Sequence, residues 1–109
     1  MPWLIEYFND GVRRDIEEWP AGVRASFLRL AERMVAYGPH LGMPHTRAFG
    51  QGLFEIRAKG REGIGRALFC LVVGHRIVIL HGFIKKSTKT PQKELETALR
   101  RLKEIVDAH

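Results

Sequence analysis

The 109-residue chain contains a single cysteine, Cys70, and no apolar run long enough for a membrane helix. One cysteine excludes an internal disulfide framework, and its place in the apolar run 67–73 indicates a small core residue. Residues 1–10 lack a basic leader and include Glu6, which argues against a signal peptide. We therefore expect a cytoplasmic protein in a reducing environment, without membrane contact.

Internal repeats, low-complexity tracts and linkers are also absent. The length and the 45% hydrophobic content fit one compact domain spanning residues 1–109, with no room for a second.

Acidic residues are scarce in one part of the chain. Residues 53–91 hold eight arginines and lysines against only Glu55 and Glu62, a difference that equals the formal charge of +6 of the whole protein. The other residues balance, ten basic against ten acidic. This concentration of charge predicts a positive sheet surface suited to a polyanion such as a phosphate backbone.

Apolar and period-two patterns predict four strands, at residues 2–8, 53–59, 64–73 and 76–84. In the second, three apolar residues alternate with Glu55, Arg57 and Lys59, which indicates one buried and one polar face. The last two are nearly continuous apolar runs, as in central strands covered on both sides. Short turns join the last three strands, which requires antiparallel hairpins. Residues 40–52 are typical of an irregular connection, with a short extended piece at 46–49.

Helical periodicity predicts three helices. The first spans residues 10–18 after a turn and N-cap at Asn9 and Asp10, and the second begins near Pro20 and ends at Gly38. The third helix follows Thr90 and Pro91, which suit an N-cap and a first-turn proline. The apolar stripe of the second helix is Val23, Phe27, Leu30 and Met34, and that of the last is Leu95, Ala98, Leu99, Leu102 and Ile105. The order strand, helix, helix, three strands, helix predicts an α+β fold with helices packed on an antiparallel sheet.

Four segments carry a family resemblance: LFEIR at residues 53–57, GRALF at 65–69, LHGFIKK at 80–86, and TP at 90–91 before a helix. In this order and spacing they resemble the phage-derived, HigB-like branch of the RelE/ParE toxin superfamily, over almost the whole chain. The resemblance implies a RelE-like fold and a type II toxin that cleaves mRNA on the ribosome without a cofactor. It also implies an antitoxin, usually a helix-turn-helix DNA-binding protein, through which the toxin reaches operator DNA.

Metal-independent RNA cleavage requires activation of a ribose 2′-hydroxyl, stabilisation of charge on the phosphorane and protonation of the leaving oxygen. Arginine suits the second task because its forked donors match phosphate oxygens. Arg57 is the first candidate, with an exposed surface arginine as the alternative. Arg66 shares a strand face with apolar residues, so we expect it to have a partner, either Glu55 structurally or phosphate functionally. The resemblance implies contact between Arg66 and the scissile phosphate.

The resemblance further implies that Lys85 and Lys86, where the last strand ends, hold or protonate the RNA, although lysine pairs there are often only solvated. His81 in the same strand is a candidate general base, with a core histidine as the commoner alternative. We expect general attraction to RNA or the ribosome from Lys59, Arg61, Arg76 and Lys89. We expect Phe83 either to stack on a base or to pack beneath the last helix. His40 and His45 have no nearby cysteine or acidic ligand, so no metal site is predicted.

One departure from the family pattern matters. RelE-type ribonucleases carry lysines in the second strand and a tyrosine in or before the last helix, whereas this chain has Glu55 and Arg57 there and only Tyr7 and Tyr37 as tyrosines. The general base is therefore unassigned. Two alternatives stay open: a ParE-like protein that inhibits a target such as DNA gyrase by binding, and a module that acts only as a co-repressor with its antitoxin.

Overall fold

The computed structural model describes residues 1–85 and 90–108. Its elements are β1 (Leu4–Tyr7), α1 (Asp10–Glu17), α2 (Ala21–Tyr37), β2 (Thr46–Gly50), β3 (Leu53–Gly60), β4 (Gly63–Val72), β5 (Arg76–Lys85) and α3 (Gln92–Ala108). The predicted α+β class and the order of elements are confirmed. Within these residues there is one strand more than predicted, because the short extended piece before β3 forms a full strand, β2.

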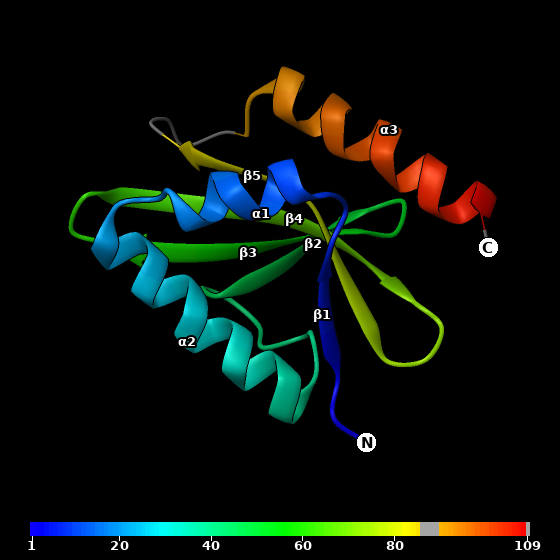
Figure 1. Cartoon of the computed structure of the whole chain (residues 1–109), viewed down its shortest axis with the longest axis horizontal. Coiled ribbons are helices and arrows are strands. Elements are labelled where there is room, and N and C mark those ends of the chain that lie inside the picture. The colour runs from blue at the N-terminus through cyan, green and yellow to red at the C-terminus, as the bar shows by residue number, and fades with distance from the viewer. Residues whose placement is uncertain (86–89, 109) are drawn as a thin grey trace.

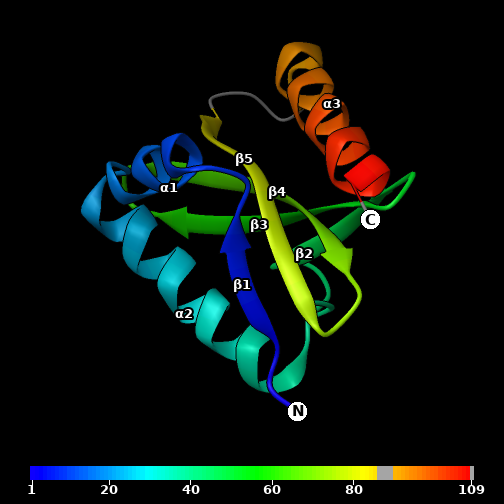
Figure 2. The ribbon, with the colours of Figure 1, turned by 45° about the vertical axis from the view of Figure 1, so that its right-hand side comes forward.

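The five strands form one sheet in the order β1-β5-β4-β3-β2. The pairs β2–β3, β3–β4 and β4–β5 are antiparallel, as the short turns require. The sheet is not wholly antiparallel, since β1 runs parallel to β5 (Figure 2). Two helices and three strands separate β1 from β5 in the chain, so no hairpin constrains their relative direction.

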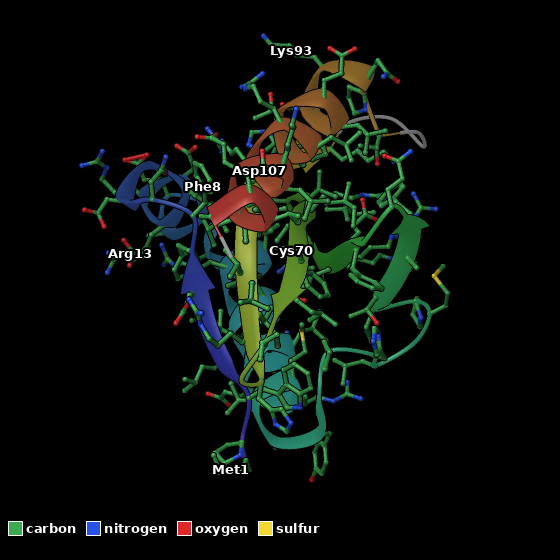
Figure 3. All side chains as sticks on the ribbon, turned by 90° about the vertical axis from the view of Figure 1, so that its right-hand side faces the viewer. Met1, Phe8, Arg13, Cys70, Lys93 and Asp107 are labelled. Atoms are coloured by element: carbon green, nitrogen blue, oxygen red, sulfur yellow. The ribbon has the colours of Figure 1, made fainter. Side chains whose placement is uncertain are left out.

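Helices cover both faces of the sheet: α1 and α2 lie on one side and α3 on the other (Figure 1). The predicted stripes are confirmed, because the four apolar residues of α2 are buried and those of α3 pack on the opposite face. Cys70 lies on β4 beneath α3 (Figure 3). It is buried as expected, and burial raises the pKa of its thiol to about 11.

The second face of β3 differs from the prediction. Its alternation is confirmed, and Lys59 near its end is exposed, but Glu55 on the same face is 0% exposed. The reason is tertiary: α3 packs over this side of the sheet, and Thr90 at its start hydrogen-bonds Glu55.

A β-bulge lies between β4 and β5. Leu68 pairs with His81, whereas the next residue, Phe69, pairs with Ile79. The extra residue, Leu80, is buried in the cluster under α3, and the neighbouring His81 hydrogen-bonds Glu94 of α3. The bulge therefore turns two consecutive side chains towards α3.

Gly60, at the end of β3, allows a close approach of α2. A Cβ atom there would lie 2.5 Å from the backbone nitrogen of Val23. The start of α2 thus packs directly beside the β3–β4 hairpin, where the backbone nitrogen of Gly22 donates to Oε2 of Glu62 over 3.1 Å. None of the described helices combines the length and the apolar character needed to span a bilayer.

Candidate active site

Four cationic side chains and one carboxylate gather on the α3 side of the sheet. We call this group the Glu55 cluster; its members are Arg47 of β2, Glu55 and Arg57 of β3, Arg66 of β4 and Lys85 of β5. Strand register brings them together, since Arg47 pairs with Glu55 and Arg57 pairs with Arg66. Four cations around one anion leave an excess of positive charge at this place.

Glu55 holds the cluster together with both of its carboxylate oxygens. Oε1 accepts from Nη1 of Arg66 at 2.8 Å and from Nε of Arg47 at 3.2 Å. Oε2 accepts from the hydroxyl of Thr90 at 3.3 Å. Charge-assisted hydrogen bonds of this kind are the strong ones, so Glu55 is tied to two neighbouring strands and to the start of α3.

Arg66 has the partner that its position requires, and the partner is Glu55. Its side chain is 3% exposed, and burial lowers its pKa although the Glu55 carboxylate raises it. An arginine with a lowered pKa still carries its charge near neutral pH. Its Nε and that of Arg57 are both buried and find no hydrogen-bond partner among the described residues. The described residues therefore leave part of the hydrogen-bonding capacity of these two guanidinium groups unused.

Lys85 is buried at the end of β5, with 6% of its surface exposed. Burial lowers the pKa of its ammonium group, and the positive charge of Arg66 lowers it further. A lysine in this setting gives up its proton more easily than an ordinary one. Lys86 and Lys89, the other predicted lysines of this segment, lie outside the described residues.

His81 lies beside the cluster but faces α3. Its Nε2 is 2.8 Å from Oε1 of Glu94, and its ring stacks with that of Phe83 at 5.7 Å between centroids. The side chain of His81 is 15% exposed, so it is partly buried rather than a fully buried core residue, and its role as a general base stays a prediction. Phe83 is buried and packs with the apolar residues under α3, the alternative to base stacking.

The remaining predicted cations lie apart from the cluster. Lys59 and Arg61 are exposed near the β3–β4 hairpin. Arg76 begins β5, at the opposite end from Lys85, and Nη2 donates to Oε1 of Glu6 over 2.7 Å. That pair raises the pKa of Arg76. Among the described cations of segment 53–91, Arg76 thus lies at the other end of β5 from the Glu55 cluster.

Arg47 is the member of the cluster that sequence reasoning missed. Its guanidinium group lies over the ring of Phe49 at 4.6 Å as well as against Glu55. The signal was present in the alternation of residues 46–49, which marks an edge strand whose arginine faces Glu55. Thr90 was predicted only as an N-cap, and its hydroxyl instead reaches the cluster.

Tyrosine is missing from the described part of the cluster. Tyr7 belongs to β1, and Tyr37 is 82% exposed at the end of α2. This agrees with the departure from the RelE pattern seen in the sequence. No group of three histidine, cysteine or carboxylate side chains suited to a metal ion occurs in residues 1–85 and 90–108.

The chain thus combines an α+β fold with a basic cluster on the α3 side of its sheet. A family model described as phage derived protein Gp49-like (DUF891) matches residues 14–103. Because the match spans most of the chain, the protein belongs to the phage-derived Gp49-like family, whose members are toxins of the RelE and HigB type. No curated protein matches the chain in a sequence search. The resemblance is confirmed at the level of the family, and its HigB-like branch stays a prediction.

Proposed function

We propose that the chain is the toxin of a type II toxin–antitoxin system and that it cleaves mRNA on the ribosome. The Glu55 cluster carries the proposal: it sets four cations around a single carboxylate on four adjacent strands. Phosphodiester cleavage builds negative charge on the phosphorane, and preorganised cations stabilise that charge. Membership of the Gp49-like family supports the assignment to a toxin.

Arg57 is the proposed phosphate contact. It is half-buried rather than enclosed, and its Nε–H has no acceptor among the described residues. A guanidinium group with free donors suits a phosphate better than an ammonium group does. Arg66 lies next to it on β4, where the ion pair with Glu55 fixes its orientation and its charge adds to the field.

Lys85 is the proposed proton donor to the leaving oxygen. Its lowered pKa makes proton release easier than from an ordinary lysine. Glu55 already accepts three hydrogen bonds, so it is not proposed as the base that activates the 2′-hydroxyl. The cytoplasmic ribosome, mRNA and a helix-turn-helix antitoxin are the proposed partners, with operator DNA reached through the antitoxin.

The test is expression in translating cells, with mRNA cuts mapped at nucleotide resolution. Wild type is expected to cut mRNA within codons, and co-expression of the antitoxin is expected to suppress the cuts. Arg57→Ala should abolish them, because it removes the phosphate contact and leaves the hydrogen bonds of Glu55 in place. Arg76→Ala is the matched control and should cut as wild type does. Intact mRNA in cells that express the wild-type protein, or full cutting by Arg57→Ala, would contradict the proposal.

A second candidate function is inhibition of a target by binding alone, as in ParE-like proteins that act on DNA gyrase. Two observations favour it: the charge of Arg66 is already paired with Glu55, and the described cluster contains no tyrosine. Arrested replication with intact mRNA would support this reading. Growth arrest in the absence of an antitoxin would exclude the third one, a module that only co-represses its operon.

A further inference from the structure

We propose that a second basic site, at the open edge of β3, binds a backbone phosphate of the RNA chain. We call it the edge pocket; its basic lining residues are Arg29 and Arg33 of α2, His45, and Arg57 and Lys59 of β3. Its volume is about 470 Å³. The proposal extends the proposed function, since it assigns the RNA a second phosphate contact next to the Glu55 cluster, with which the pocket shares Arg57.

The edge of β3 is open from Arg57 onwards, and the turn before β2 and helix α2 lie on either side of it. The register of β2 and β3 ends with Thr46 opposite Ile56, so β2 does not cover β3 from Arg57 onwards. The turn before β2 is fixed there, because the backbone nitrogen of Arg57 donates to the carbonyl oxygen of His45 over 2.8 Å. On the other side α2 runs past the end of β3 (Figure 1), as the close approach at Gly60 allows.

Charge in the edge pocket is of one sign. Four arginine and lysine side chains line it, and no carboxylate does. Within the described residues none of the four forms an ion pair. Unpaired cations around a hollow are a condition under which an anion binds favourably.

The pocket is continuous with basic surface on both sides. A neighbouring hollow shares Arg29 and Lys59 and adds Arg61 from the β3–β4 hairpin. In the other direction, Arg57 pairs in register with Arg66 of the Glu55 cluster. A track of cations therefore leads from the proposed cleavage site to the edge of the sheet and on to the hairpin.

Such a track fits a ligand that carries an anion at every repeat. A single-stranded RNA with its scissile phosphate at Arg57 and Arg66 has further phosphates on either side, and the edge pocket lies where one of them would extend. Arginine forks match phosphate oxygens in pairs. An acidic segment of a partner protein is the competing ligand, and the experiment below separates the two.

The test uses a fluorescent single-stranded RNA with 2′-O-methyl riboses, which binds but cannot be cleaved through the 2′-hydroxyl. Arg29 and Arg33 are exposed on α2, so Arg29→Gln/Arg33→Gln removes two charges without opening the core. The matched control is Arg100→Gln/Lys103→Gln, which removes two charges from exposed positions of α3. Urea unfolding checks that both variants stay folded.

Loss of two arginine contacts to the phosphate should weaken RNA binding about tenfold or more, because hydrogen bonds to charged groups are the strong ones. It should also reduce the slope of log affinity against log salt by about 0.7, the contribution of one phosphate on a single strand. The control should change affinity and slope much less. Equal losses in both variants, or no binding of this RNA by wild type, would overturn the edge pocket.

Two further outcomes keep this proposal separate from the nuclease proposal. If wild type cuts no mRNA but the α2 variant alone loses RNA binding, the edge pocket stands and the nuclease function fails. If the α2 variant keeps RNA binding and loses affinity for the antitoxin, the pocket holds an acidic protein segment, and the RNA assignment is overturned.

Discussion

Replacing Glu55 by glutamine tests whether one carboxylate holds the Glu55 cluster together. Glutamine keeps the shape and one oxygen acceptor but removes the charge, which leaves Arg66, 3% exposed, without an anion. Arg47, Arg57 and Lys85 lie close enough to interact electrostatically with Arg66, and all three are cations. Breaking a buried pair in this way costs about 3–5 kcal/mol. At about 4–8 °C for each kcal/mol in a domain near this size, a loss of 3 kcal/mol lowers Tm by about 12–24 °C.

The assay is urea unfolding monitored by circular dichroism, for wild type, Glu55→Gln, Arg66→Met and Glu55→Leu/Arg66→Met. The double variant removes both charges and fills their place with apolar atoms, which is often neutral or stabilising. It is therefore expected to recover most of the stability that Glu55→Gln loses. The reasoning is refuted if Glu55→Gln costs less than about 1 kcal/mol with an unchanged urea slope. A double variant no more stable than Glu55→Gln would refute it equally.

Three further predictions concern Lys85, Gly60 and Arg76. Burial and the charge of Arg66 lower the pKa of Lys85 in the folded chain below its ordinary value of 10.5. Just below pH 10.5, Lys85 therefore binds a proton more fully in the unfolded chain than in the folded one. The unfolding free energy should thus rise with pH through this interval, and urea titrations of Lys85→Met should lack that rise. Gly60→Ala places a Cβ against the α2 backbone and should lower the free energy of unfolding by about 1–3 kcal/mol. An unchanged urea midpoint would contradict this prediction. Arg76→Ala breaks a partly exposed pair with Glu6 and should cost about 0–1 kcal/mol, without loss of RNA binding in the anisotropy assay.

Local patterns predicted the elements that depend on local periodicity. The stripe from Val23 to Met34 is buried because apolar side chains spaced three and four apart must share one face of a helix. The hairpins of β3, β4 and β5 follow from turns too short for any other connection. In the same way Arg66, a charge among apolar neighbours, was expected to have a partner, and Glu55 on the neighbouring strand β3 is that partner.

What sequence could not show depends on contacts between distant segments. Glu55 looked like an outward-facing residue because its cover, α3, comes much later in the chain. Arg29 and Arg33 fall in the part of the chain whose charges balance, so the charge count did not single them out. They become neighbours of Arg57 and Lys59 only when α2 packs beside the open edge of β3. A charge count along the sequence therefore located the basic segment but not the basic pocket.

The environment of each arginine decides what its substitution can reveal. Removing Arg66 leaves Glu55 buried and uncompensated, so lost activity in an Arg66 variant confounds folding with chemistry. Arg57 makes no ion pair among the described residues, and the contacts of Glu55 survive its loss. It is also the residue that the Glu55 cluster and the edge pocket share. Because one change at Arg57 reaches both sites and spares the buried pair, it separates function from stability more cleanly than any change at Arg66.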